Sequence, residues 1–391
     1  MWNSMKTSTL YIVGSFYDQP SRILSYATVA SSLGVTPRFI GEVTDVNYSN
    51  LTAEQFVFTD ETTICAAHAA LSINKDNQAL ERKLTALMQL SDKVRARQLT
   101  SHAFPHEYFV VRSEADLKSI PKLEERWLCK PRWGSNSRDV QEISNSCGLR
   151  KAIEPITARN NHALIERYIE GSHICIDFAW NGTELALIGY CEKRMTDFGR
   201  KIVEAFHTLS DDTLRYAKLA REKLLPLFLE SFSDVSFTIH GEFIVEDATG
   251  DLRIAELNPR APWGMLPELF SIGNGINFDH AVIANALGQS VPTVSCSQPV
   301  VLGSIFTEGF FSNHETVPDQ GNTLFIERFD QPEGDEPGEN KLTKYGRFML
   351  WGTSQEAVEK EWNDLAAIAV PEEVRLAGKL DTSDTWKSKC C

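Results

Sequence analysis

Three absences narrow the possible functions of this chain. No apolar run approaches the roughly 18 residues of a membrane-spanning helix, and the first nine residues lack the apolar core of a signal peptide. No G-x-G-x-x-G motif follows the first predicted strand, so nothing supports dinucleotide binding. The eight cysteines form no C-x-x-C pair and no zinc-binding spacing. The sequence therefore predicts reduced, mostly buried thiols in a cytoplasmic protein without a membrane segment.

Positive charge is also scarce. The 391 residues include 39 Lys and Arg against 53 Asp and Glu, which gives a formal net charge of −14. Nucleic acids and anionic membranes bind basic surfaces, so we expect neither as a partner. A small anionic ligand is not excluded, because a local cluster of cations can reverse the field inside a cleft. The final Cys390-Cys391 pair is interpreted as an exposed, oxidisable tail rather than a prenylation site.

The predicted elements indicate an α/β protein that is long enough for two or three domains. Residues 9–40 predict strand, helix and strand, with Gly34 ending the helix, which is a βαβ unit. A long helical stretch is predicted over about 76–103. The other expected elements are strands within 104–111, 125–131 and 162–169, helices over 148–160, 211–232 and 275–287, hairpins over 172–193 and 237–257, a joint at 291–299 and an exposed loop at 330–340.

The hairpin over 237–257 carries the most specific chemical signal. A three-residue loop of Ala248, Thr249 and Gly250 places Glu242 directly opposite Glu256, with their Cβ atoms about 5 Å apart. Asn258 shares that face because strand side chains alternate. Facing carboxylates repel unless a cation lies between them, and two carboxylates with an amide oxygen suit Mg²⁺. The alternative is a solvated sheet face, and a two- or four-residue loop would place the glutamates on opposite faces.

A basic loop provides a candidate site for phosphate. In "LCKPRWGSNSRDV" (128–140), Lys130 ends an apolar strand, and Gly134 and the serines allow close approach of backbone N–H donors. Arg132 and Arg138 could add charge, although a plain surface turn is the alternative.

Two further stretches have chemical interpretations that the residues leave open. "SDKVRARQL" places Lys93, Arg95 and Arg97 on the first turns of a helix, where the helix dipole disfavours cations. An anion would explain this arrangement, and a solvated basic face would explain it as well. "ERYIEGSH" (166–173) could offer backbone groups to an adenine ring, or it is simply a connector.

Taken in order, these stretches resemble the ATP-grasp superfamily, and within it the carboxylate–amine ligases, closest to the bacterial L-amino acid ligases. The matching runs are "DK" at 92–93, "KPRWGSNSRDV" at 130–140, "IERYIEGSH" at 165–173, "CEKR" at 191–194, "HGEF" at 240–243 and "ELNPRAPWG" at 256–264. The resemblance implies an α/β (α+β ATP-grasp) fold. It implies an N-terminal Rossmann-like domain over 1–91, a two-lobed core over 92–299 (nucleotide lobe about 105–168, catalytic lobe about 169–299) and a C-terminal α+β domain over 300–391.

The resemblance also implies roles for individual residues. Lys93 and Lys130 would grip the ATP phosphates, and Arg260 would steady an acyl phosphate. The loop over 132–138, with Arg132, Gly134, Ser135 and Ser137, would close over the triphosphate. The remaining implied roles are Glu166, Arg167, Tyr168 and Ile169 for adenine; Glu242, Glu256 and Asn258 for Mg²⁺ or Mn²⁺; Lys193 and His207 for catalysis; and Arg194, Trp263 and Gly264 for the substrate pocket.

Two positions depart from the family pattern. His173 stands where a glutamate usually binds the ribose hydroxyls, and a histidine can still accept one hydrogen bond there. Trp263 stands where a small residue is common, so the acyl pocket should differ from that of any relative.

The expected function is ATP-dependent coupling of a small carboxylate to an amine through an acyl phosphate, with release of ADP and phosphate. Two alternatives are acylation of a carrier-protein thiol or peptide terminus, and a nucleotide-binding module without turnover. The expected partners are ATP, small substrates and a second copy of the chain, with the 9–90 segment as a possible interface.

Overall fold

The computed structural model describes residues 9–14, 20–41, 56–73, 77–121, 123, 125–134, 139–143, 146–159, 161–197, 201–208, 211–262, 264–294, 298–306, 310, 322–333 and 344–369. Of the exposed loop predicted at 330–340, residues 334–340 lie outside these residues, as do 295–297 of the joint predicted at 291–299 and the terminal Cys390-Cys391. The first four residues of the predicted loop, 330–333, belong instead to a strand, β14 (Thr323–Glu333). Within the described part, no helix is both long enough and apolar enough to cross a membrane.

The N-terminal βαβ unit forms as predicted. Strands β1 (Thr9–Val13), β2 (Thr36–Ile40) and β3 (Phe56–Phe58) make a parallel sheet in the order β2-β1-β3. Helix α1 (Pro20–Ser32) connects the first two strands, and Gly34 follows it with a φ of 76°, a left-handed conformation that glycine adopts without strain.

The predicted helical stretch over 76–103 is two helices rather than one. Helix α2 (Glu61–Ile73) precedes α3 (Gln78–Ser91), and α4 (Lys93–Thr100) follows after a single residue. That residue, Asp92, ends α3 in an extended conformation and caps α4, accepting hydrogen bonds from the N–H groups of Val94 and Arg95. A capping aspartate therefore interrupts an otherwise helical pattern.

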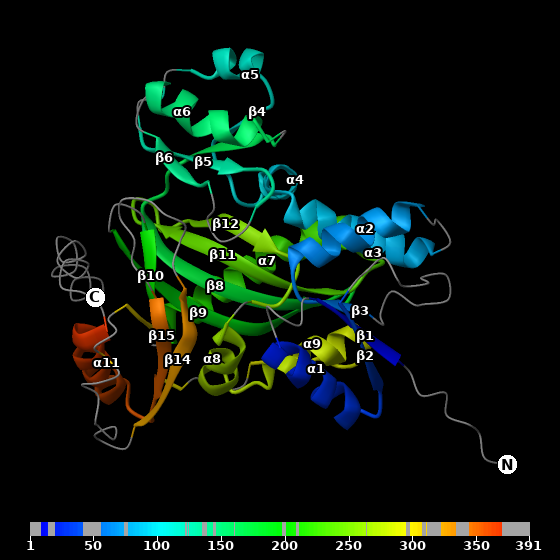
Figure 1. Ribbon diagram of the computed structural model, residues 1–391, viewed down its shortest axis with the longest axis vertical. Helices are drawn as coiled ribbons and strands as arrows, with labels where there is room; N and C mark the ends of the chain where they lie inside the picture. The colour runs from blue at the N-terminus through cyan, green and yellow to red at the C-terminus, as the bar shows by residue number, and fades with distance from the viewer. Residues whose placement is uncertain are drawn as a thin grey trace.

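Residues 108–167 form a small lobe around a four-stranded antiparallel sheet. Its strands β4 (Tyr108–Val111), β5 (Trp127–Pro131), β6 (Gln141–Ile143) and β7 (Ala163–Arg167) lie in the order β4-β7-β5-β6. Helices α5 (Glu114–Ser119) and α6 (Ser146–Thr157) pack on this sheet. Figure 1 shows the small lobe standing over β11 and β12, with α4 between the lobe and the strands.

A large antiparallel sheet forms the centre of the molecule. Its order is β12-β11-β8-β9-β10-β13-β15-β14. The strands are β8 (Gly171–Trp180), β9 (Leu185–Asp197), β10 (Lys201–His207), β11 (Phe237–Glu246), β12 (Leu252–Asn258), β13 (Val300–Ile305), β14 (Thr323–Glu333) and β15 (Lys344–Trp351). Because β13 pairs with β10, the segment after 299 extends this sheet instead of forming one of its own.

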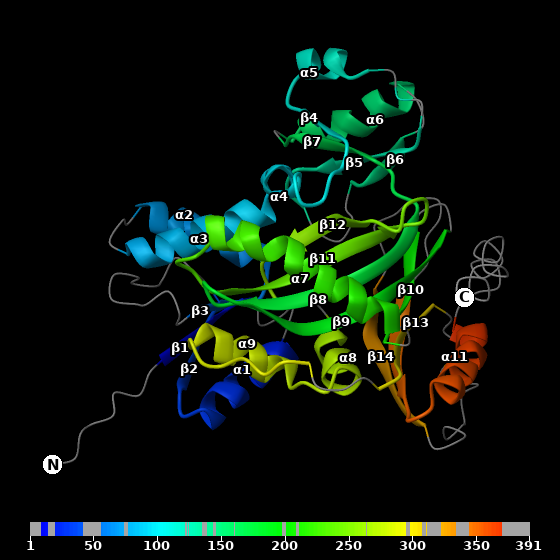
Figure 2. The same ribbon diagram turned by 180° about the vertical axis from the view of Figure 1, so that it is seen from behind.

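Helices cover both faces of the central sheet. Helix α7 (Asp211–Ser231) packs on one face through Leu224 and Phe228, which belong to the same apolar cluster as Ile174, Ile176 and Phe178. Figures 1 and 2 show α7 across the sheet from α8 (Leu266–Gly273), α9 (Phe278–Ala286) and α1. Helix α11 (Gln355–Ala369) packs against β13 and β15.

Candidate functional site

The two glutamates of the β11–β12 hairpin face each other as predicted, but for a different reason. The turn has four residues, 247–250, because Val245 pairs with Leu252 and the N–H of Glu246 donates to the carbonyl of Asp251. The prediction of a three-residue loop was therefore wrong. The register shifts between Glu242 and Phe243, where β12 contains one extra residue, Ala255, and this bulge restores the pairing of Glu242 with Glu256.

Lysines neutralise both glutamates. The Lys193 Nζ lies 2.7 Å from Glu242 Oε2, and the Lys93 Nζ lies 2.9 Å from Glu256 Oε1. Burial raises the pKa of Glu242, but Lys193 and His240 more than offset it and lower that pKa to about 2. The facing carboxylates therefore do not need a metal to relieve their repulsion, because two ammonium groups already do so in this structure.

A second row of polar side chains lies beside the glutamates. Asn258 pairs directly with His240 on β11, and His240 pairs with Asp177 on β8. We call the face that carries Glu242, Glu256, Asn258, His240 and Asp177 the glutamate face. The His240 Nδ1 lies 2.8 Å from Asp177 Oδ2, and its Nε2 lies 4.0 Å from Glu242 Oε1.

The sequence interpretation missed His240 as a candidate functional residue. Burial lowers its pKa, but the interaction with Asp177 raises that pKa well above the usual value. The signal was present in the sequence, because a residue two positions from Glu242 on a strand must share its face.

Lys130 is held between the small lobe and β12. Its Nζ lies 2.6 Å from Glu166 Oε2 and 3.4 Å from the Ala255 carbonyl oxygen. Glu166 also pairs with Arg97 at 2.5 Å, and Arg97 donates to the Ile254 carbonyl at 2.8 Å. Burial raises the pKa of Glu166, but Arg97 and Lys130 lower it to about 2. A narrow cavity here is lined by Leu90, Lys93, Ala96, Arg97, Thr100, Lys130, Leu164, Glu166, Ile254, Ala255, Glu256 and Leu257.

Asp92 provides an anion at the basic start of α4, where its carboxylate lies 3.5 Å from the Arg95 guanidinium. It is fully buried, caps the helix and pairs with the Arg132 guanidinium at 2.5 Å. The Arg132 side chain is therefore engaged with Asp92, and it also lies over the ring of Trp133. The Lys93 Nζ also donates to the Gly134 carbonyl. Ser135 and Ser137 lie outside the described residues.

In the connector after β7, one backbone N–H differs from its neighbours in making no backbone hydrogen bond among the described residues. The N–H of Arg167 donates to the Glu107 carbonyl at 3.1 Å, and the N–H of Tyr168 donates to the Arg126 carbonyl at 2.8 Å. Within the described residues, the N–H of Ile169 donates no backbone hydrogen bond. Of the three residues whose backbone was predicted to bind adenine, only Ile169 has a backbone N–H that is not already used in these hydrogen bonds.

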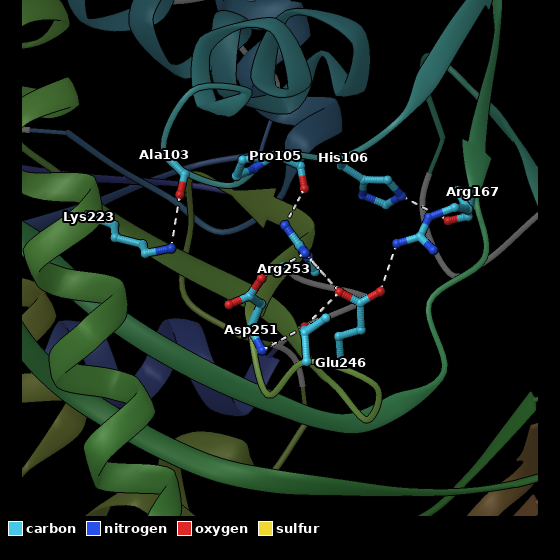
Figure 3. A network of polar contacts seen from close by, with 9 residues as sticks. Ala103, Pro105, His106, Arg167, Lys223, Glu246, Asp251 and Arg253 are labelled. Carbon is cyan, nitrogen blue, oxygen red and sulfur yellow. Dashed lines mark hydrogen bonds and ion pairs between the residues drawn. The ribbon is translucent and has the colours of Figure 1, made fainter.

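Two segments of the chain connect the small lobe to the rest of the molecule, 101–107 and 168–170, and we call them the crossings. A single carboxylate, that of Glu246, links the residues at these crossings (Figure 3). Glu246 accepts from Arg167 at 2.7 Å and from Arg253 at 2.8 Å, and Arg253 donates to the Pro105 carbonyl at 2.7 Å. His106 Nε2 lies 2.8 Å from the Arg167 carbonyl. Burial lowers the pKa of His106 to about 4, so the neutral ring donates this bond. We call this set the Glu246 cluster.

Arg260 follows β12 and is held by the N-terminal segment. Its Nε donates to Glu61 Oε1 on α2 at 2.7 Å, and only 7% of the residue is exposed. The carbonyl of Gly264 accepts from Arg22 of α1 at 3.0 Å. Trp263 lies outside the described residues. The first 91 residues therefore help to fix the loop that carries Arg260.

His207 and Arg194 do not join the glutamate face. His207 pairs with Glu192, and Arg194 pairs with Ala205, whereas Lys193 lies between Glu192 and Arg194 on β9 and points to the other side. Burial lowers the pKa of His207 to about 4 and raises that of Glu192 to about 7. Alternation along β9 therefore separates His207 from Lys193, and the predicted role of His207 in facing the substrate stays a prediction.

His173 does lie on the glutamate face. It pairs with Lys193 on β9 and with Ile244 on β11, and its charge interaction contributes to the lowered pKa of Glu242. Among the described residues, no group of three or more His, Cys, Asp or Glu is arranged to hold a metal ion. Any metal would therefore need Asn258 as well as the two glutamates.

Comparisons with known proteins identify the fold. No protein-family model matches the chain, and no curated protein sequence matches it. The structure is similar to N5-carboxyaminoimidazole synthetase from Staphylococcus aureus complexed with ADP (16% identity, TM-score 0.65, covering 95% of this chain and 98% of that one). It is also similar to L-amino acid ligase from Bacillus licheniformis (15%, 0.65, 92% and 97%).

A third solved structure extends the likeness over a full chain. N5-carboxyaminoimidazole synthase from Aspergillus clavatus, in complex with ADP and 5-aminoimidazole ribonucleotide, has 13% identity and a TM-score of 0.67, covering 94% of this chain and 100% of that one. At such identities the likeness establishes architecture. The chain has the ATP-grasp fold that its sequence motifs led us to expect.

Proposed function

We propose that this protein is an ATP-dependent ligase that converts a small carboxylate into an acyl phosphate and couples it to an amine. The observation that carries the proposal is the pairing of Glu242 with Glu256 between Lys193 and Lys93, on a sheet directly below the small lobe. Such a site can bind nucleotide phosphates, because ammonium groups neutralise the negative charge of the phosphates.

The nucleotide would occupy the junction between the small lobe and β12. Lys93 and Lys130 reach this junction from α4 and β5, and both line the narrow cavity. The N–H of Ile169 would serve the base, and the loop from Gly134 onward would cover the phosphates. In this structure Lys93 and Lys130 are paired with Glu256 and Glu166, so nucleotide phosphates would have to take over these lysines.

The donor set fits Mg²⁺. Glu242, Glu256 and Asn258 offer hard oxygen ligands on one face, and phosphate oxygens would be further ligands. When bound, the ion would supply charge neutralisation for the transferring phosphoryl group. The task of the protein side chains is then to hold the nucleotide phosphates with lysines and to position the acid.

The acyl-transfer step would use residues next to the glutamates. A carboxylate is a poor electrophile, and phosphorylation turns one of its oxygens into a leaving group that an amine can displace. Arg260 would face the oxyanion that develops during this attack. His240, held by Asp177, would keep Glu242 in position from 4.0 Å away. Closure of the small lobe would exclude water, which otherwise hydrolyses the acyl phosphate.

The test is phosphate release over a matrix of amino acids and other carboxylates, each with and without amines. We expect release only when ATP, an acid and an amine are all present. Glu256→Gln should abolish release, and Arg260→Ala should lower it by about 10²–10³-fold because an oxyanion donor is lost.

The matched controls are Glu184→Gln and Arg215→Ala, whose side chains are 58% and 67% exposed. Both should leave turnover unchanged, and circular dichroism should show all four variants folded. Undiminished release in Glu256→Gln and Arg260→Ala would refute the site. Tight ATP binding without release for any substrate pair would favour a binding module, and release only with an added protein partner would favour a carrier-bound acceptor.

A further inference from the structure

Two cysteines continue the row of glutamates across the central sheet. Glu256 on β12 pairs with Glu242 on β11, Glu242 pairs with Cys175 on β8, and Cys175 pairs with Cys191 on β9. Both thiols are free and fully buried. Neither cysteine has a part in the proposed ligase chemistry, although Cys175 is the direct cross-strand neighbour of a proposed metal ligand.

The backbone places the two cysteines directly opposite each other on neighbouring strands. Directly opposed residues of antiparallel strands have Cβ atoms about 4.5–5.5 Å apart, and a disulfide needs about 3.5–4.5 Å. The two side chains lie on the same face of the sheet, because directly opposed residues of antiparallel strands share a face. A small approach of β8 and β9 would be enough to join them.

A small oxidant could enter from the proposed site. The side chains of Glu242 and Lys193 are 26% and 13% exposed, and both lie next to the thiol pair on the same face. Lys193 is two residues from Cys191 on β9.

We propose that Cys175 and Cys191 are a peroxide-sensitive modification site that closes to a cross-strand disulfide. One thiol attacks hydrogen peroxide, forming a sulfenic acid and releasing water. The second thiol then displaces the hydroxyl group as a second water and forms the S–S bond. The two thiols lose two electrons and two protons in total, and the peroxide is reduced to two waters.

The consequence would be a shift of the Lys193–Glu242 pair. Joining the strands at Cys191 pulls on β9 two residues before Lys193, while Glu242 stays opposite Cys175 on β11. The oxidised protein would therefore hold Lys193 differently from the reduced one, and a thiol reductant would restore it.

The experiment measures intact mass and disulfide-linked peptides of the folded full chain after exposure to hydrogen peroxide. Cys390→Ser and Cys391→Ser are introduced first, to remove the vicinal pair at the end of the chain. We expect the loss of two hydrogen atoms per chain, a cross-linked peptide containing Cys175 and Cys191, and full reversal by dithiothreitol. The added variant Cys191→Ser should show no such peptide.

Three results would overturn the proposal: no link in the folded chain, a link that forms only after unfolding in urea, or a sulfinic acid at either cysteine in place of the link. Since the measurement is of mass, it gives an answer whether or not the chain proves to be a ligase. Cys129→Ser serves as a matched control, because Cys129 is also buried but lies on β5 of the small lobe.

Discussion

At the scale of single residues, the site is built from carboxylates whose charges are all compensated. Glu166 is the clearest case, since it is 1% exposed and pairs with Arg97 and Lys130 from different elements. Removing one partner of a buried ion pair leaves an uncompensated charge, which costs more than the pair contributes. Glu166 therefore belongs to the framework that holds Lys130, in addition to its predicted place in the connector.

Glu166→Gln should lower the free energy of unfolding at pH 7 by about 3 kcal/mol, because Arg97 and Lys130 lose their shared anion. The pKa of Glu166 is about 2 in the folded chain, below the ordinary value of 4.5. Its stabilising effect is therefore complete above pH 4.5 and disappears as the pH falls toward 2. Urea unfolding between pH 7 and 3 should show a steeper loss in the wild type than in the variant. Glu170→Gln, with a 59% exposed side chain, is the control and should cost less than about 1 kcal/mol.

The two histidines give a test of the face assignment. His240→Gln should lower kcat/KM for phosphate release by roughly 10- to 100-fold, as expected when a residue that orients a metal ligand is lost. His207→Gln should leave kcat/KM near the wild-type value, because His207 shares a face with Glu192 and not with Lys193. The reverse outcome, with both variants folded by circular dichroism, would show that the functional face is the other one.

The residues of the site could be predicted in part from sequence. The pairing of Glu242 with Glu256 was predicted correctly, although the turn length was wrong and an unforeseen bulge corrected it. Bulges depend on contacts with neighbouring strands, which a hairpin's own sequence does not specify. The lysine partners of the glutamates could not be foreseen either, since Lys93 and Lys193 reach them from distant parts of the chain.

At the scale of elements, the Glu246 cluster ties the tip of the β11–β12 hairpin to both crossings of the small lobe. The α7 residue Lys223 supports the first crossing by donating to the Ala103 carbonyl at 3.1 Å (Figure 3). Any rotation of the small lobe has to stretch these contacts, because its only covalent links to the rest of the described chain are the two crossings.

Glu246→Gln should loosen the small lobe. The variant leaves Arg167 and Arg253 without their shared carboxylate, at a cost of about 1–3 kcal/mol to the local structure. Amide hydrogen exchange should accelerate in 101–107 and 167–170 and remain unchanged in β8 and β9. Asp251→Asn is the control, since Asp251 meets the same arginine with a 58% exposed side chain. Equal exchange in both variants would mean that Glu246 does not restrain the lobe.

Elements were predictable where the local pattern was complete. The βαβ unit, α7 and the two hairpins of the central sheet match the sequence periodicity. Strand β10 and helix α8 were not predicted, and α8 begins at a Leu-Pro step that lacks a side-chain cap. A helix whose start depends on packing rather than capping leaves little local signal.

At the scale of the whole molecule, the proposed domains share their cores. Phe56 and Phe58 of the first segment belong to the same apolar cluster as Trp180 and Phe228 of the central sheet and α7. On the opposite face, Val300, Leu302 and Met349 pack with Phe270 and Cys191. Such clusters join residues far apart in sequence, which a local pattern does not reveal. The domain boundaries at 91 and 299 stay predictions.

A chain that ends at residue 299 should therefore not fold cooperatively. It would expose the edge of β10 and remove the apolar partners that β13 and β15 provide. We expect aggregation, or the loss of a sharp thermal transition measured by calorimetry. A chain that ends after Ala369 retains every described element and is the control. Cooperative unfolding of the shorter chain would show that the central sheet is complete without its last three strands.

The bulge at Ala255 has one more consequence. Deleting that residue would let the β11–β12 ladder run straight with Glu256 still opposite Glu242, yet it would withdraw the carbonyl that Lys130 contacts. The bulge is thus a point of contact between the small lobe, which carries Lys130, and the central sheet. A hairpin without the bulge would keep Glu242 opposite Glu256 but would lose this contact between the small lobe and the central sheet.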